Sequence, residues 1–256
     1  KKASVLATIE EQGKLTDELK KQIEAVMTMV ALEDLYRPYR PKRRTRATIA
    51  KEKGLEPLAE ILRAQATTRT IEEEATAFVD AEKGVESVQD AIDGAKDILA
   101  EVYADDADYR TKLRAMTKES GSLVAKAKDE EADSVYEMYY DFSEPIKKLV
   151  GHRILAINRG EAEKFLTVKI EAPRQEILLW LVKQIIGNMK HDSASYLYEA
   201  ITDSYDRLIA PSIEREIRNE LTEKAEEGAI GVFGKNLHQL LMQPPISGQV
   251  VLGWDP

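Results

Sequence analysis

The chain has 256 residues, of which 43% are hydrophobic and 32% charged, and its formal net charge is −9. It contains no cysteine, which excludes disulfides and cysteine-bound metals, and it shows neither an apolar run of membrane-spanning length nor a signal peptide. We therefore expect a cytoplasmic protein without membrane contact, whose acidic body repels nucleic acid except where cations gather locally.

The first 35 residues predict two helices, over residues 3–11 and 17–35. Gly13 follows the first helix, as a glycine that ends a helix does. Thr16 or Asp17 can cap the second helix, in which apolar residues recur at helical spacing from Leu19 to Val30.

A basic loop follows, over residues 37–46. Pro38 and Pro41 end the helical pattern because proline has no backbone N–H and restricts the residue before it. The loop carries six cations and no acid, and Tyr36 and Tyr39 are interleaved with them. Arginine offers a rigid fork of donors and a flat stacking face, so such a loop suits phosphates and stacked bases. The candidate nucleic-acid-binding residues are Arg37, Tyr39, Arg40, Lys42, Arg43, Arg44 and Arg46.

A structural role for the same loop is an alternative, because basic runs are signals of low specificity. The body of the chain is acidic, so the loop could be paired internally with acidic helices. Ion pairs from Arg43 and Arg44 to acids of this chain would favour such an internal clasp. Exposure of these arginines beside Arg37 and Lys51 would favour nucleic acid.

Residues 46–104 read as a small helical unit, either separate or inserted in a larger one. Pro57 lies in the first turn of a predicted helix, Thr70 and Glu73 fit a capping box, and Ser87 can cap a helix that runs to about Tyr103. Residues 84–101 faintly resemble a helix-hairpin-helix, but the acids around them favour simple helix packing.

The middle of the chain mixes helices with weak strand signals. We predict a helix over 107–119, an extended segment or loop over 122–128, an aromatic-rich helix over 130–142 and a helix from Pro145 to about Asn158. The tyrosines of residues 130–142 favour a packing face rather than a platform for bases. Leu166 to Ile170 alternates like a short strand, the only β element that we expect before residue 250.

The last third is predicted to be helical. Pro211 interrupts a helix that begins at Ser193, and Ser212 can cap the next one. Apolar residues then recur every four positions from Ile213 to Leu241, which predicts a spine helix over about 212–242, roughly 46 Å long. Three glycines at positions 228, 231 and 234 either permit close backbone packing, the reading we favour, or mark a break.

The predicted fold class is all-α, a multi-helix assembly with a long C-terminal spine helix and at most one or two short strands. The predicted parts are residues 1–45 (helices and basic loop), 46–104, 105–249 (a helical scaffold that contains the spine) and 250–256. Residues 250–256 form a short apolar strand pattern with no partner strand after it.

No catalytic constellation emerges from the sequence. Phosphate-binding glycine loops, HExxH motifs and nucleophile elbows are missing, and the three histidines, at 152, 191 and 238, are scattered. We expect no enzyme activity, no metal and no cofactor.

Four stretches resemble the bacterial Tex family of transcription accessory proteins. They are LEDLYRPYRPKRRTRATIAKEKGLEPLA (32–59), EPIKKLVGHRILAINRGEAEKFL (144–166), DSYDRLIAPSIEREIRNELTEKAEEGAI (203–230), and VFGKNLHQLLMQPP (232–245) with VVLGWDP (250–256). The resemblance extends over essentially the whole chain. The resemblance implies that this chain is a fragment, because family members have helical sequence before the part that it matches. After that part they have an RNase H-like domain, a helix-hairpin-helix segment and an S1 RNA-binding domain. Residues 250–256 would be the first strand of the RNase H-like domain.

The expected function is therefore an N-terminal helical scaffold of a Tex-like transcription accessory protein. It would position the downstream RNA- or DNA-binding domains, which are the expected main grip on nucleic acid, and contact nucleic acid itself through Arg37–Arg46. The alternative is a protein-interaction scaffold that docks transcription or translation machinery and uses the basic loop as an internal clasp.

Overall fold

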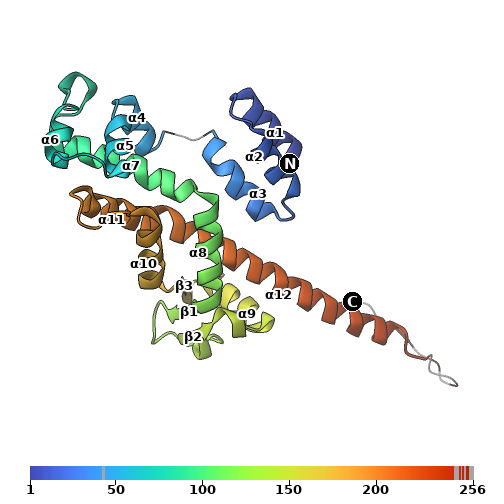
Figure 1. Cartoon of the computed structure of the whole chain (residues 1–256). Coiled ribbons are helices and arrows are strands. Elements are labelled where there is room, and N and C mark those ends of the chain that lie inside the picture. Colours follow the sequence, from blue (N-terminus) through green and yellow to red (C-terminus); the bar gives the residue numbers. More distant parts are fainter. Residues whose placement is uncertain (42–43, 245–247, 249, 251, 254–256) are drawn as a thin grey trace. The chain divides into compact units, whose positions relative to one another are not determined.

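The computed structural model describes residues 1–41, 44–244, 248, 250 and 252–253 (Figure 1). The chain divides into two compact units that cut across chain order. The first unit contains residues 1–124, 143–147 and 169–217, and the second contains residues 125–142, 148–168 and 218–256. Residues 46–104 therefore lie wholly inside the first unit.

The first three helices share a small apolar core. They are α1 (Lys2–Glu11), α2 (Asp17–Ala25) and α3 (Met29–Tyr36). Thr16 caps α2, and Gly13 has a φ of +66°, as predicted. The predicted helix over 17–35 is split, because Thr28 begins α3 with a second cap. The core of this bundle consists of Val5, Ile9, Leu19, Ile23 and Leu32.

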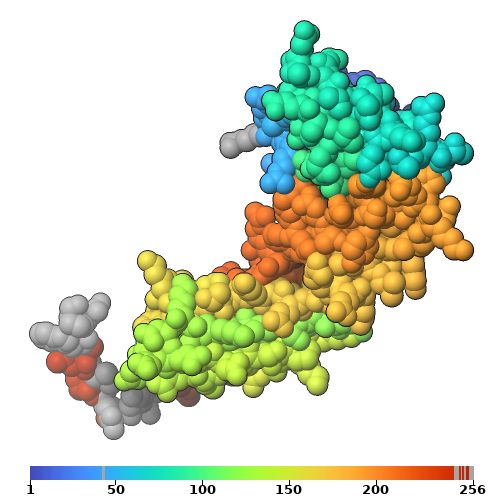
Figure 2. Space-filling view, turned by 90° about the vertical axis from the view of Figure 1, so that its left-hand side faces the viewer, coloured from blue at the N-terminus to red at the C-terminus, as the bar shows by residue number. Residues whose placement is uncertain are grey.

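Four further helices of the first unit surround α7 (Val88–Asp105). They are α4 (Arg46–Glu52), α5 (Glu56–Ala64), α6 (Ile71–Thr76) and α11 (Ser193–Asp203), and all four pack on α7. Figure 2 shows α7 and α11 with their surfaces in direct contact. Gly94 of α7 permits the close approach of the chain between α4 and α5, since a Cβ there would lie 2.3 Å from Leu55 Cδ1. The capping boxes predicted at Thr70 and Ser87 are both present.

The remaining helices of the first unit carry the chain toward its C-terminal half. α8 (Ala107–Ser120) packs against α10 (Arg174–Ile185), where Tyr109 meets Trp180 edge to face with ring centroids 5.8 Å apart. α11 continues without a break through a π-helical segment, Ser204–Ile209, into α12 (Ala210–Leu241). The amide of Ala210 bonds to the carbonyl of Tyr205, five residues back. The predicted interruption at Pro211 is therefore wrong: the widened turn before this proline lets the helix pass through it.

Three strands form one sheet among the described residues, whereas the sequence predicted at most one or two short strands and only Leu166–Ile170 before residue 250. They are β1 (Ser122–Ala127), β2 (Asp141–Pro145) and β3 (Leu166–Glu171), in the order β2-β1-β3. β3 buries every second residue and confirms the alternation seen in the sequence. β2 was missed because Ser143-Glu144-Pro145 also fits a helix start. The helix after it, α9 (Gly151–Ala162), begins six residues later than predicted, after a 3-10 turn at Ile146–Lys148.

The predicted helix over 130–142 is also wrong. This segment holds only a 3-10 turn, Glu137–Tyr139, before β2. The Tyr140 hydroxyl donates to the Ala132 carbonyl at 2.5 Å and fixes the loop instead. The tyrosines do pack as expected: Tyr136 and Tyr139 are buried, and Tyr136 lies 5.8 Å from the ring of Phe165.

The spine helix α12 is confirmed, and its 32 residues span about 48 Å. Within the second unit, Gly151 of α9 lies against it, since a Cβ at Gly151 would be 3.3 Å from Ala225 Cα. Arg218 pairs with Glu161, and Asn158 donates to Thr222 at 2.8 Å. The close packing predicted at Gly228, Gly231 and Gly234 is wrong: nothing lies within 4 Å of a Cβ at any of them, and the helix is unbroken there. The strand predicted over 250–256 falls largely on residues 251 and 254–256, outside the described residues.

Candidate nucleic-acid interface and buried charge cluster

The basic loop begins with a short 3-10 turn, Arg37–Tyr39, with Pro38 inside it. It ends at Thr45, whose side chain accepts the Thr48 amide at 3.1 Å and begins α4. Pro38 therefore ends α3 as the sequence predicted. Lys42 and Arg43, two of the candidate residues, lie outside the described residues.

Arg37 points inward rather than toward solvent. Its Nη2 lies 3.4 Å from Ser212 Oγ and 4.0 Å from Glu216 Oε1, and a third of the side chain is exposed. Burial, together with the positive charge of nearby Arg110, lowers the pKa of Arg37. This arginine therefore belongs to the interior of the first unit as much as to the loop.

Tyr39 also faces its own chain. Its side chain is half-buried against the core of α1–α3, and its carbonyl accepts Gln12 Nε2 at 2.7 Å. A ring held in this way offers less of its face to a base than a fully exposed tyrosine would.

The other described arginines of the loop are exposed. Arg44 Nη2 lies 3.3 Å from Glu52 Oε2 and Arg46 Nη1 lies 4.0 Å from Asp97 Oδ1, with 72% and 66% of the two side chains exposed. Arg40 is exposed, and its side chain has no hydrogen-bond or ion-pair partner among the residues that the structure describes. Exposed pairs of this kind are weak and exchange readily with solvent ions or phosphates.

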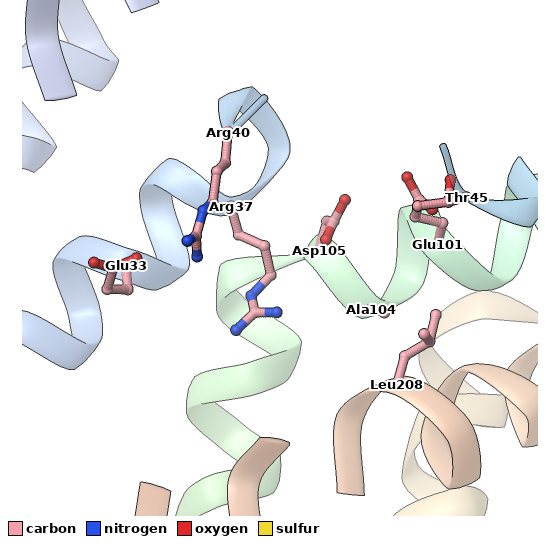
Figure 3. A pocket seen from close by; sticks show the side chains of 8 residues that line it. All are labelled: Glu33, Arg37, Arg40, Thr45, Glu101, Ala104, Asp105 and Leu208. Atoms are coloured by element: carbon pink, nitrogen blue, oxygen red, sulfur yellow. The ribbon is translucent and has the colours of Figure 1, made fainter. Parts of the chain in front are cut away.

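A cavity of about 240 Å³ lies beside the loop (Figure 3). Arg37 and Arg40 reach it from the short turn after α3, and Glu101 and Asp105 reach it from α7. Glu33 of α3 adds a third carboxylate, so the lining is of mixed charge. The cavity is therefore not a purely cationic pocket for a phosphate.

A buried cluster of four charges, which sequence reasoning missed, lies under the loop. Arg110 Nε lies 2.7 Å from Asp34 Oδ1, and Arg110 Nη2 lies 2.7 Å from Glu216 Oε1. Arg114 Nη2 bridges the same two carboxylates at 2.7 and 2.8 Å. The Arg110 side chain is fully buried, and that of Asp34 is 3% exposed. The cluster joins α3, α8 and the start of α12.

The surroundings of Glu216 in this cluster favour the charged form of its carboxyl group. Burial by itself would raise the pKa of Glu216, but hydrogen bonds from Arg114 and Ser212 and the charges of both arginines outweigh it and lower that pKa. A sequence signal for the cluster exists: Arg110 shares the buried face of α8 with Leu113 and Thr117, three and seven residues further on.

Two features of the described part of the chain bear on metal and membrane binding. No group of three or more His, Asp or Glu side chains there is placed to hold a metal ion. No helix of the described residues has both the length and the apolar character that crossing a bilayer requires.

The fold and this site define a helical domain with a long spine helix, an acidic body and a loop rich in arginines. The family model described as Tex central region-like matches residues 66–233, so the chain belongs to the Tex family.

Proteins similar to this chain span bacteria and man. The chain is 48% identical to "Uncharacterized protein YdcI" of Bacillus subtilis and 36% identical to "Transcriptional accessory protein Tex" of Neisseria gonorrhoeae, over 100% of its length in both cases. It is 31% identical to human "S1 RNA-binding domain-containing protein 1" over 99% of its length. It spans 36%, 34% and 27% of these three proteins, about a third of the length of the two bacterial ones.

Proposed function

We propose that this chain is a non-catalytic helical scaffold within a longer Tex-family protein. One observation supports the proposal: the second half of α12 is exposed although it carries large apolar side chains. Ile230, Phe233 and Leu240 are each between 63% and 69% exposed, and Leu237 is 41% exposed. Exposing an apolar helix face of this kind to water is unfavourable, so the face indicates a surface that another domain or protein covers.

The spacing of the apolar residues explains why they are buried in the first half of α12 and exposed in the second half. A step of four residues advances about 40° around a helix of 3.6 residues per turn, so the stripe turns by about 200° between Ile213 and Phe233. Ile213 and Ile217 are buried by the first unit. Phe233 and Leu237 face another direction, which suits a second domain.

The experiment is association of this chain with the separately expressed remainder of the Bacillus subtilis relative. We expect the two to co-elute, and Phe233→Glu/Leu237→Glu to abolish co-elution while leaving the unfolding temperature of the chain unchanged. Gln239→Glu, on the opposite side of the same exposed half, is the control and should still associate. Equal association of all three chains would contradict the scaffold proposal.

We propose nucleic acid as a further contact of this chain, through Arg40, Arg44 and Arg46. The names of two relatives, a transcriptional accessory protein and an S1 RNA-binding domain-containing protein, support nucleic-acid association. We also propose a cytoplasmic place beside the transcription machinery. The exposure of these arginines supports the same contact.

Binding of single-stranded RNA and duplex DNA at about 50 and 200 mM salt tests this contact. Two or three phosphate contacts give a log–log salt slope of roughly −2 to −3. We expect Arg40→Glu/Arg44→Glu to remove binding and the charge-matched Lys183→Glu/Lys190→Glu to retain it. A chain that binds nothing at low salt would leave this role to other parts of the longer protein.

The internal clasp is the second candidate for the loop, and two ion pairs favour it. Arg44 lies against Glu52 and Arg46 lies near Asp97 of α7, both within the first unit. If the clasp holds the loop, the double variant Arg44→Glu/Arg46→Glu melts earlier without any effect on nucleic-acid binding.

A further inference from the structure

An open groove lies on the face of the first unit formed by α2, α3 and α8. Its volume is about 520 Å³. Ala25 and Val26 line it from the end of α2, Ala31 and Leu35 from α3, and Ala107 and Thr111 from the start of α8. Small side chains on three helices leave a channel into which the larger side chains of another helix can fit.

The groove is acidic. Asp34, Asp106 and Asp108 contribute to its lining, which includes no lysine, arginine or histidine. Asp34 is neutralised by Arg110 and Arg114. Asp106 accepts the Tyr109 amide as the cap of α8, and Asp108 is exposed in the first helical turn. The negative charges of Asp106 and Asp108 are therefore not compensated by any cation of the lining and are available to a partner.

The turn beside the groove is unusually apolar for an exposed segment. Met27, between α2 and α3, is 95% exposed, and Met29 and Val30, at the start of α3, are 52% and 38% exposed. Methionine is flexible and polarizable, and it is common at surfaces that accept apolar side chains of partner helices. The groove thus combines a channel of small apolar residues, an apolar lip and an acidic rim.

We propose that this groove docks a cationic amphipathic helix of a partner protein. The apolar face of such a helix would lie along Val26, Leu35 and Met29, and its lysines or arginines would face Asp106 and Asp108. A second copy of this chain is a poor occupant, because two bodies of net charge −9 repel each other. The proposal does not depend on the role of α12 or on nucleic-acid binding.

The test uses this chain and three synthetic helical peptides in fluorescence anisotropy. The probe peptide places leucine at helical spacing on one face and lysine on the rest. One control peptide replaces leucine by serine, and the other replaces lysine by glutamate. We expect only the probe to bind well, because the groove requires both an apolar face and positive charge.

Variants then locate the binding. Asp108→Lys/Thr111→Lys should weaken probe binding by roughly tenfold or more, with an unchanged circular dichroism spectrum. The charge-matched control Thr68→Lys/Glu86→Lys, on exposed positions elsewhere in the first unit, should bind as the unchanged chain does. Equal binding by both variants, or equal binding of the leucine and serine peptides, would overturn the proposal. So would self-association of the chain that Asp108→Lys/Thr111→Lys abolishes, since the occupant would then be a second copy.

Discussion

The first unit holds two groups of arginines with opposite surroundings. Arg110 is fully buried and Arg114 is 12% exposed, and the two make four contacts of 2.7–2.8 Å with Asp34 and Glu216. Arg44 and Arg46 are mostly exposed, and their pairs are longer, at 3.3 and 4.0 Å. An arginine side chain therefore stabilises the fold in the buried cluster, whereas in the loop it is a cation available to ligands. Burial of the partners, not residue type, makes the difference.

Arg110→Met should cause the largest loss. It leaves the nearly buried Asp34 with one arginine instead of two, and breaking a buried pair by removing one partner typically costs about 3–5 kcal/mol. Arg44→Met is the matched control from the loop and should cost about 0–1 kcal/mol. Urea unfolding of both variants measures the difference, and similar losses would remove the contrast between the two groups.

Glu216→Gln tests the acid side of the cluster. We expect a loss of about 1–3 kcal/mol at neutral pH, because two buried donors lose a charged acceptor. The folded pKa of Glu216 lies below its ordinary value of 4.5, so the unfolded state binds the proton first. This contribution is therefore present above pH 4.5 and is lost as the pH falls through the folded pKa.

Unfolding curves between neutral and acid pH check the sign. The decline in stability below pH 4.5 should be shallower in Glu216→Gln than in the unchanged chain, since one titrating group is gone. A steeper decline in the variant would show that Glu216 is not stabilised as a carboxylate in the folded protein.

Arg37→Gln should have an intermediate effect, about 1 kcal/mol. Arg37 belongs to the loop by sequence, but it reaches Ser212 and Glu216 at the edge of the cluster. Its loss of stability should survive an increase in salt, because partly buried pairs are screened less than exposed ones. A cost that disappears in salt would place Arg37 with the exposed arginines.

Arg46→Gln should have the smallest effect, below about 0.5 kcal/mol at low salt and close to zero at about 1 M. Thermal unfolding at the two salt concentrations measures it. A larger loss that persists in salt would mean that the contact with Asp97 holds the loop in place and would favour the internal clasp.

The sequence by itself determined the helical class, most helix caps and the spine. Thr16, Thr70 and Ser87 each satisfy free amides at a helix start, which is a local interaction that the neighbouring residues specify. The period of apolar residues likewise predicted α12 and the strand β3, because periodicity records which face is buried.

Only the tertiary structure decided which charged side chains are buried and which strands pair. Asp34, Arg110 and Glu216 are far apart in the chain and look like ordinary polar residues of amphipathic helices, until packing brings them together. β2 lacks a strong strand pattern and exists because β1 supplies its hydrogen bonds. The helix continues through Pro211 because the turn before this proline widens to π geometry. In each case the deciding contact is between residues distant in sequence or depends on a backbone adjustment, neither of which residue types alone specify.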